Sequence, residues 1–381
     1  MSEGIRLGVD ASNLRDGGGV THLYQFLAAA DPVAAGVREV VVWGGSAALE
    51  RLSPRPWLRA VRVAALDGSL ASRSAWRLRE LPALTRGLGA LFAPGGLAGA
   101  SHCPVVVMSR NMLPFEERER RRFGLGPLGW RLRALREVQS RSFSRADGVI
   151  FLSRYAAQSV LPTLRPRPAR VAVIPHGVDD RFRFEPRPAR RSVGPDDPLR
   201  VLYVSQLSPY KHNAVAAEAV ARLRREGFDL SLELVGGADR EADRRVFTAW
   251  ARRADPSGEF VRWRGAVTHA ALPAKYHRAE VFLYASSCEN LPNTLVEAMA
   301  AGLPVASSDR GPMPEVLGDA GVYFDPEDVS SVTRALRGLA ASPELRDDLA
   351  ARAYASALSR SWSRCAAETL AFVRDVAAVR R

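Results

Sequence analysis

The feature that most constrains the fold of this 381-residue chain is a regular alternation of short apolar runs with amphipathic helical patterns. Each run has the length of a strand that is buried on both faces. The first series is 5–10, 39–44, 61–66, 90–95, 104–109, 147–153 and 170–175, with helical segments such as 21–31 in between. Because strands that alternate with helices form parallel sheets with right-handed crossovers, the sequence predicts an open, doubly wound α/β domain.

A second series of runs follows a break in this pattern. Residues 185–198 are rich in proline and charge and have no apolar period, which is typical of a linker. Further strands are expected at 199–205, 230–236, 259–265, 280–286, 304–309 and 321–325, and helices at 214–227, 294–302, 329–342 and 362–380. We therefore expect a first domain at 1–184 with 362–381 packing back on it, the linker 185–198, and a second domain at 199–361.

Composition narrows the class of protein. The net charge of +13 comes almost entirely from arginine, since the chain has only two lysines, Lys211 and Lys275. The charge suits anionic partners, but no zinc finger, RNA-recognition motif or helix-turn-helix pattern points to nucleic acid. Three dispersed cysteines without metal-binding spacing favour a reducing compartment. Without an apolar leader or an 18-residue apolar window, we expect a cytoplasmic protein.

Ligands of such sheets bind beyond the carboxyl ends of the strands, so the loops after strands hold the candidate residues. Residues 17–19 are glycines before a helix, where the backbone can approach a ligand and amides can meet an anion. A mobile turn is an equal alternative. In the loop after residue 205, Lys211 at a helix start can supply a point charge to phosphate oxygens, and Gln206 can donate to the same oxygens. The alternative is a solvated helix start.

The segment 286–305 carries two carboxylates, Glu289 and Glu297, on either side of a turn. We expect Asn293 to be the N-cap of the following helix and Gly302 to end it. Glu297 then falls in the first turn, where the helix dipole favours an ionised carboxylate that can accept hydrogen bonds from a sugar diol. The amides of residues 293–295 would point at an anion. A capped helix alone would explain Glu297 but not Glu289.

The two glutamates and the residues that follow them, 298–305, resemble the Glu-x7-Glu motif of family 4 retaining glycosyltransferases. Three further segments match in the family's order. Residues 174–179 resemble its Pro-x-Gly-Val-Asp segment, 311–316 its Gly-Gly-x-x-Glu turn, and 151–153 its strand-end serine. The matches cover most of the chain and are strongest over 170–326.

The resemblance implies the glycosyltransferase-B fold, in which two Rossmann-like doubly wound domains face each other across a cleft and a C-terminal helix crosses back to the first domain. It implies a hexosyltransferase with an NDP-sugar donor, retention of anomeric configuration and no cofactor or essential metal. We expect the acceptor to be a glycan or lipid-linked intermediate of surface polysaccharide or glycolipid synthesis, with a small-molecule natural product as the alternative.

The resemblance also implies roles for individual residues. Glu297 would bind the ribose hydroxyls, Lys211 would neutralise the diphosphate, and Glu289 would hold the donor sugar. The remaining donor-binding candidates are Gly18, Gly19, Gln206, Gly265, Val267, Asn290, Leu291, Asn293, Thr294 and Leu295.

Two positions depart from the family pattern. Gln206 stands where the family usually has an arginine, which removes a positive charge beside the leaving diphosphate. Arg110 or Asn111 stands where the family often has a histidine, so we expect Arg110 to act in catalysis by orienting substrate, with Asn111 and His22 on the acceptor side. A structural ion pair is the alternative for Arg110. Because of these departures, a nucleotide-sugar-binding protein without turnover is an alternative to the transferase. A sugar-nucleotide epimerase is a third and more distant alternative.

The basic run 116–145 has two interpretations. One is a solvated helical face that lines the acceptor cleft. The other is peripheral contact with anionic lipid at the inner face of the membrane, with Trp130 as an apolar anchor.

Overall fold

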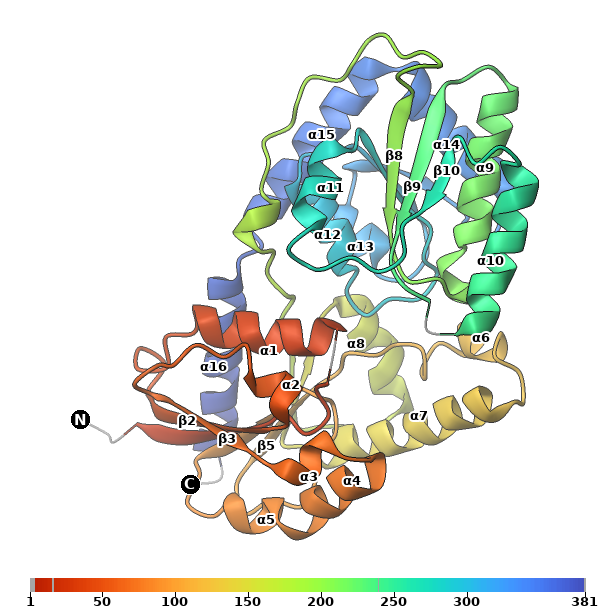
Figure 1. The fold of residues 1–381 in the computed structure, drawn as a ribbon. Helices are drawn as coiled ribbons and strands as arrows, with labels where there is room; N and C mark the ends of the chain where they lie inside the picture. The colour runs from red at the N-terminus through yellow and green to blue at the C-terminus, as the bar shows by residue number, and fades with distance from the viewer. Residues whose placement is uncertain (1–3, 16, 239, 380–381) are drawn as a thin grey trace. The chain divides into compact units, whose positions relative to one another are not determined.

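The computed structural model describes residues 4–15, 17–238 and 240–379, and the chain divides into two units (Figure 1). Unit 1 is built from the described residues up to Gly177 and from Arg360 onward. Unit 2 is Val178–Ser359. Each unit contains its own parallel sheet, as the alternating pattern predicts.

The sheet of unit 1 has seven strands in the order β3-β2-β1-β4-β5-β6-β7. The strands are β1 (Ile5–Asp10), β2 (Val37–Gly44), β3 (Leu58–Arg62), β4 (Ala90–Ala93), β5 (Val105–Met108), β6 (Gly148–Phe151) and β7 (Arg170–Val173). All neighbouring strands pair in parallel. The central strands β4, β5 and β6 are buried along their whole length, which explains why their sequences are continuous apolar runs.

The strand predicted at 61–66 is misplaced. The structure has β3 at Leu58–Arg62 and a short helix, α3 (Ala64–Asp67), where the prediction continues the strand. β3 is an edge strand whose residues are all exposed or half-buried, so it lacks the apolar run that marks a buried strand. The Asp67 carboxylate accepts hydrogen bonds from the Ser46 amide at 2.6 Å and its hydroxyl at 3.0 Å, which fixes this corner.

The remaining elements of unit 1 are α1 (Gly17–Ala29), α2 (Ser46–Leu49), α4 (Leu70–Arg79), α5 (Leu81–Leu84), α6 (Glu117–Arg121), α7 (Pro127–Arg145), α8 (Arg154–Val160), the 3-10 turn η1 (Leu161–Thr163) and α16 (Trp362–Ala378). The C-terminal helix α16 packs against α1 and against β4 and β5. Its buried face includes Leu370, Val373 and Val376, so the last helix of the chain completes the core of unit 1.

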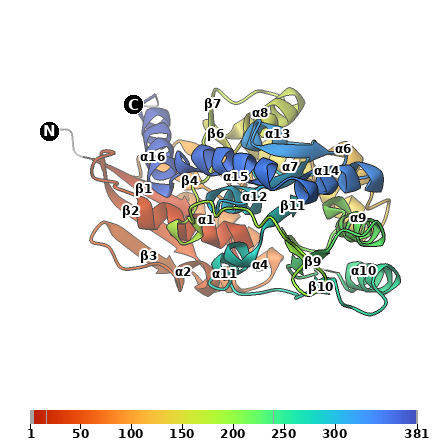
Figure 2. The ribbon, with the colours of Figure 1, turned by 90° about the horizontal axis from the view of Figure 1, so that it is seen from above.

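The sheet of unit 2 has six strands in the order β10-β9-β8-β11-β12-β13. The strands are β8 (Leu199–Val204), β9 (Leu230–Val235), β10 (Val261–Trp263), β11 (Val281–Tyr284), β12 (Val305–Ser308) and β13 (Gly321–Phe324). The helices are α9 (Asn213–Arg225), α10 (Glu241–Ala254), α11 (Leu272–Arg278), α12 (Asn293–Ala300), α13 (Met313–Leu317), α14 (Val329–Ala341) and α15 (Pro343–Leu358), with 3-10 turns η2 (Asp180–Phe182) and η3 (Pro209–Lys211). Helix α9 packs against α10 and α14, and α12 against α15 (Figure 2).

The boundary between the units falls at Gly177, earlier in the chain than the domain end expected at residue 184. The segment after it is held by unit 2: the Phe184 amide donates to the Ala300 carbonyl at 3.1 Å, and the Arg190 guanidinium pairs with Glu280. The proline-rich segment 185–198 therefore runs along unit 2 rather than apart from it, because Arg190 and Arg191 pair with Glu280 and Glu344 outside the segment.

A substitution at Gly177 can test how closely the start of α16 packs in unit 1. A Cβ built on Gly177 would lie 2.2 Å from the Trp362 amide nitrogen, and backbone cannot move aside as a flexible side chain can. We expect Gly177→Ala to lower the free energy of unfolding by about 1–3 kcal/mol through overpacking. Denaturant unfolding provides the measurement. Gly338→Ala is the control, because Gly338 lies inside α14 and a Cβ there would have no atom within 4 Å. This substitution should raise the free energy of unfolding by about 0.5–1 kcal/mol. An unchanged free energy of unfolding for Gly177→Ala would contradict the close packing of Gly177 against α16.

Candidate functional site

The order of the strands in unit 2 defines a topological switch point between β8 and β11. These strands are neighbours in the sheet although they are far apart in the chain, and the chain moves outward in opposite directions from them. Open α/β sheets bind ligands beyond the carboxyl ends of strands at such a point. The loop after β8 carries Gln206 and Lys211, and the loop after β11 carries Glu289 and Asn290, so four predicted site residues lie in these two loops.

A buried ion pair joins the two loops. The Lys211 ammonium donates to Glu289 Oε1, and the same oxygen accepts a hydrogen bond from the Tyr284 hydroxyl at 2.7 Å. The Lys211 and Glu289 side chains are only 12% and 15% exposed. Burial by itself lowers the pKa of Lys211, but the Glu289 carboxylate overcomes this and holds that pKa above its ordinary value. Lys211 is therefore a fully charged ammonium fixed at the switch point.

Backbone and hydroxyl contacts reinforce the connection. The Ser287 amide donates to the Tyr210 carbonyl at 2.8 Å, the His212 ring nitrogen Nε2 lies 2.8 Å from the Ser287 hydroxyl, and the Tyr203 hydroxyl donates to the Lys211 carbonyl at 2.6 Å. Lys211 ends the 3-10 turn η3 and precedes α9, so it does not open the helix as the sequence suggests. His212 between them has φ 46°, and this left-handed residue separates the turn from the helix.

The loop after β9 approaches the loop after β8 closely. A Cβ on Gly236 would lie 2.0 Å from the Ser205 carbonyl oxygen, so only glycine fits there. The Gly236 amide donates to the Gly265 carbonyl at 2.8 Å, which ties in the loop after β10. Gln206 is exposed beside this junction, while Gly265 and Val267 are half-buried. The predicted donor-binding residues 206, 265 and 267 therefore follow β8 and β10, the two strands that flank β9, at the carboxyl edge of one sheet.

Glu297 lies in a second polar cluster of unit 2. Its carboxylate accepts a hydrogen bond from the Tyr276 hydroxyl at 2.8 Å and lies 3.9 Å from His269 Nε2. The other ring nitrogen of His269 is 3.1 Å from an Arg181 guanidinium nitrogen, and Arg181 pairs with Asp179 at 2.7 Å. Burial raises the pKa of Glu297 to about 7, against the hydrogen bond from Tyr276, which lowers it. The carboxyl is thus poised to change charge near neutral pH.

The start of α12 differs from the prediction. Pro292 holds the N-cap position, so Asn293 is the first helical residue and not the N-cap. Glu297 consequently lies past the first turn, where burial outweighs the helix dipole. The predicted row of amides is also reduced, because the Asn293 amide donates to the Leu291 carbonyl and the Leu295 amide to the Pro292 carbonyl. Of the three amides, only that of Thr294 makes no hydrogen bond to the described residues. Gly302, with φ 64°, ends the helix as predicted.

In unit 1, Arg110 packs over the glycines that begin α1. A Cβ on Gly19 would lie 2.7 Å from one Arg110 guanidinium nitrogen, and one on Gly18 would lie 3.6 Å from the other. Burial lowers the pKa of Arg110 to about 10, and its Nε has no hydrogen-bond partner among the described residues, which leave out Asp16. The structural ion pair considered for Arg110 is therefore absent from the described part of the chain. Asn111 next to it is exposed.

His22 is buried deeper in unit 1 than a substrate contact would require. Its ring stacks on His176, with 4.6 Å between the ring centroids, and lies 5.8 Å from Trp362 at the start of α16. Burial, followed by the neighbouring His176 and Arg110, keeps the pKa of His22 well below its ordinary value. A neutral, 1%-exposed imidazole in this position supports the packing of α16. Its predicted place on the acceptor side stays a prediction.

Sequence reasoning missed the tyrosines that hold the two glutamates. Tyr276 and Tyr284 are almost completely buried, and each gives its hydroxyl to one carboxylate. Tyr284 ends β11, so its position before the motif was a usable signal. Tyr276 lies on α11, distant in sequence, and only the fold brings it to Glu297.

Comparison with known proteins identifies the family. The model described as "Glycosyl transferases group 1" matches residues 187–356, and the model described as "Glycosyltransferase Family 4" matches 16–182. A GDP-mannose-dependent alpha-(1-6)-phosphatidylinositol monomannoside mannosyltransferase of Mycolicibacterium smegmatis is 31% identical over 234 residues, 57% of this chain and 59% of that protein. Glycogen synthase of Mycobacterium tuberculosis is 30% identical over 216 residues, 55% of this chain and 50% of that protein. The chain thus spans about half the length of these relatives.

Solved structures agree on the fold. Sucrose-phosphate synthase from Thermosynechococcus elongatus superposes with a TM-score of 0.76 at 19% identity, covering 98% of this chain and 100% of that one. Anabaena HepE in complex with UDP-glucose gives a TM-score of 0.71 at 16% identity, covering 96% and 99%. The chain belongs to glycosyltransferase family 4 and has the glycosyltransferase-B fold. Among the described residues, no helix is long and apolar enough to cross a membrane.

The raised pKa of Glu297 predicts an unusual effect on stability. A carboxyl whose folded pKa is about 7 resists ionisation, so its contribution is favourable below its unfolded value of 4.5 and is lost as the pH rises through 7. Glu297→Gln should therefore be more stable than the natural protein at pH 8, by up to about 3 kcal/mol, and equally stable below pH 4.5. Denaturant unfolding across this range measures the difference.

Glu280→Gln is the matched control with the opposite sign. Glu280 is buried, but Arg190 and Arg200 overcome the effect of burial and lower its pKa. Glu280→Gln should lower the free energy of unfolding at pH 8, and this difference from the natural protein should disappear as the pH falls. A Glu297→Gln protein that is less stable at pH 8 would contradict the account of Glu297.

Proposed function

We propose that this chain is a retaining glycosyltransferase that transfers a hexose from an NDP-sugar to an acceptor. Membership of the family supports this activity, and the observation that carries it is the Lys211–Glu289 pair at the switch point of unit 2. A fixed ammonium with a carboxylate beside it is suited to a substrate that combines a diphosphate with a polyhydroxyl sugar. Two of the proteins compared above use or bind nucleotide sugars: the mannosyltransferase depends on GDP-mannose, and HepE was solved with UDP-glucose.

In this proposal the donor lies along the carboxyl edge of the unit 2 sheet. Glu297 accepts hydrogen bonds from the ribose hydroxyls, and the nucleobase lies near Gly265 and Val267. Burial and the nearby Asp179 raise the pKa of Glu297, whereas the hydrogen bond from Tyr276 and the charge of Arg181 lower it and so favour the ionised form. Because Glu297 becomes a carboxylate only near pH 7, we expect nucleotide affinity to rise as the pH increases from 6 to 8.

Lys211 supplies the principal electrostatic contribution to transfer. As the sugar–phosphate bond breaks, negative charge grows on the leaving diphosphate, and a preorganised ammonium stabilises that charge without reorganisation. The acceptor hydroxyl attacks from the same face, and its proton passes to a leaving phosphate oxygen, which gives retention without a protein base or a metal. Glu289 holds Lys211 in place and faces the donor sugar. Arg181 does not replace the family arginine in this scheme, because it pairs with Asp179 beside Glu297.

The acceptor is proposed to meet unit 1 near Arg110 and Asn111, where the guanidinium packs on the first turn of α1. A glycan or lipid-linked intermediate of surface polysaccharide synthesis is the leading acceptor class, with a small-molecule natural product second. Contact with anionic lipid at the inner face of the membrane is part of the same proposal, and Trp130 is 60% exposed.

Gln206 supports one alternative function. It stands exposed where the family has an arginine, so a binding protein without turnover would keep Lys211 and lose the second charge. The two functions separate in one experiment. The purified protein is incubated with GDP-mannose, UDP-glucose, ADP-glucose or TDP-glucose, and released nucleoside diphosphate and free sugar are measured. Slow donor hydrolysis supports the transferase, whereas nucleotide binding without release supports the binding protein.

Replacing Lys211 alone would leave Glu289 buried without its partner, which can cost about 3–5 kcal/mol and unfold the site. The test therefore uses the double variant Lys211→Met/Glu289→Gln, which removes both charges and keeps the side-chain volumes similar. It should fold but lose donor hydrolysis or transfer by about 100-fold or more, because the leaving group is no longer stabilised. Initial rates at saturating donor measure the effect.

The chain offers a matched control in its other lysine. Lys275 pairs with Glu233 at 2.9 Å in the same unit, and neither is a predicted site residue. Lys275→Met/Glu233→Gln should retain activity within about threefold, as expected for a partly exposed pair. Equal activities of the two double variants would remove Lys211 and Glu289 from the mechanism.

A further inference from the structure

Unit 1 contains a basic hollow that the proposed transfer does not use. It has a volume of about 550 Å³ and is lined by Arg120, Arg133, Arg136, Glu137, Ser140, Arg141, Ser144, Thr163 and Arg165. We call it the arginine hollow. Most of its residues lie in the basic run 116–145, but none of them was singled out from the sequence as an individual donor or acceptor residue.

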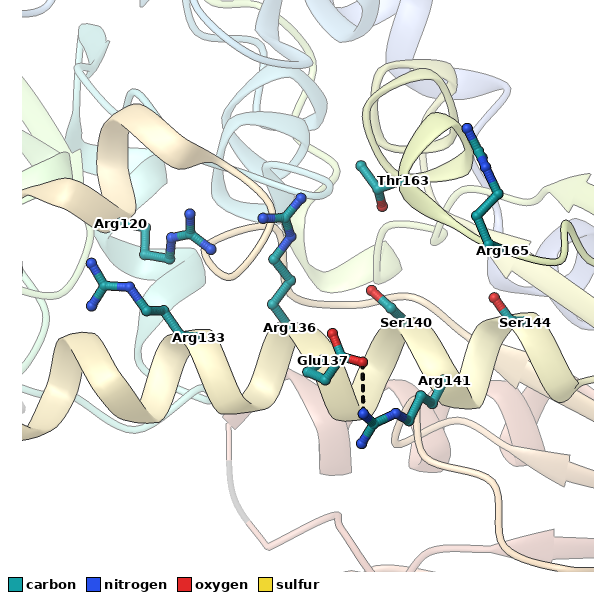
Figure 3. Close-up of a pocket in the computed structure, with 9 residues that line it drawn as sticks. All are labelled: Arg120, Arg133, Arg136, Glu137, Ser140, Arg141, Ser144, Thr163 and Arg165. Carbon is teal, nitrogen blue, oxygen red and sulfur yellow. Dashed lines mark ion pairs between the residues drawn. The ribbon is translucent and has the colours of Figure 1, made fainter.

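Three separate elements build the arginine hollow. On α7, residues at spacings of three and four, from 133 to 144, share one face of the helix. Arg120 reaches in from α6, and Thr163 and Arg165 come from η1 and the residues after it. Figure 3 shows the Arg120 guanidinium between those of Arg133 and Arg136, with the Ser140 and Thr163 hydroxyls farther along the helix. Arg120 and Thr163 thus approach the hollow from elements other than α7, which carries Arg133, Arg136 and Ser140.

The charges in the arginine hollow are not balanced. Its one carboxylate, Glu137, pairs with Arg141 at 3.0 Å. Arg120, Arg133 and Arg136 make no ion pair with any described residue, and nearby Glu117 pairs with Arg121. Partial burial, followed by repulsion from Arg136 and Arg133, lowers the pKa of Arg120. The attraction of Glu117 offsets only part of this repulsion, so positive charge remains in excess and is unfavourable for the protein alone.

An ordinary solvated face does not account for this arrangement. In the chain's other helices, arginines commonly find carboxylates on the same surface: Arg337 pairs with Glu226 at 2.6 Å, Arg364 with Glu368 at 2.6 Å, and Arg244 with Glu241 at 2.5 Å. Arg120, Arg133 and Arg136 instead line one hollow and make no ion pair with a described residue. Guanidinium groups are planar donors that bind phosphate in pairs, and serine and threonine hydroxyls donate to the same oxygens.

We propose that the arginine hollow binds the phosphate or pyrophosphate group of a small soluble molecule. A compact ligand matches side chains that converge on a concavity, whereas a bilayer would require them to spread over a flat surface. Arg120, Arg133 and Arg136 would contact the phosphate oxygens, and the hydroxyls of Ser140 and Thr163 would complete the site. This proposal concerns a site in unit 1 alone and does not depend on the donor site in unit 2.

The test compares three full-length proteins: the natural chain, Arg133→Gln/Arg136→Gln, and the control Arg131→Gln/Arg145→Gln. The control removes the same charge from the same helix at exposed residues outside the hollow. Inorganic pyrophosphate is titrated by calorimetry. The site at Lys211 is common to all three proteins, so a difference between the variants belongs to the hollow. We expect the Arg133/Arg136 variant to bind pyrophosphate at least about tenfold more weakly, and the control to remain within about twofold.

Equal binding by all three proteins, or an equal loss in the control, would overturn the proposal, since the effect would then be absent or due to net charge alone. A second arm measures cosedimentation with phosphatidylglycerol vesicles against phosphatidylcholine vesicles. Binding to phosphatidylglycerol that depends on Arg133 and Arg136, without a matching dependence for soluble pyrophosphate, would assign the phosphate to a membrane surface and overturn the soluble ligand.

Discussion

The buried contact between Lys211 and Glu289 is the interaction on which the rest of the site depends. It connects the loops that follow β8 and β11, which are neighbours in the sheet but separated in the chain by two strands and three helices. Removing either charge from this 12–15% exposed pair would leave the other without compensation. The pair therefore fixes the geometry of both loops and holds a positive charge at the switch point.

Each unit also contains charge arrangements that lower the stability of the free protein. Glu297 is held in surroundings that raise its pKa to about 7. Arg110 is buried on the first turn of α1 without a carboxylate among the described residues. The arginine hollow gathers like charges on α6 and α7. We propose that each arrangement becomes favourable when a ligand binds: sugar hydroxyls at Glu297 and anions at the arginines. Unfavourable charges retained in a fold are a physical indication of binding sites.

The sequence predicts most of the fold because buried parallel strands need continuous apolar runs, and twelve of the thirteen strands lie within or overlap such runs without a shift into a helix. β3 is the exception, since an exposed edge strand carries no such signal. The sequence also placed Glu289, Glu297 and Lys211 in loops after strands. It could not place Tyr276, which reaches Glu297 only through the fold, or the Leu291 and Pro292 carbonyls that occupy the amides of Asn293 and Leu295. The position of Pro292 at the N-cap likewise depends on local backbone geometry rather than on residue preference.

We propose that the loops after β8 and β11 together bind the nucleoside diphosphate part of a sugar donor. Hydrogen exchange of the full-length protein, measured by mass spectrometry with GDP and with UDP in turn, tests this most directly. We expect one of the nucleotides to slow exchange in both 205–213 and 286–297, because a ligand that bridges the Lys211–Glu289 pair orders both loops. Saturation by either nucleotide with protection in only one of these loops, or in neither, would contradict it.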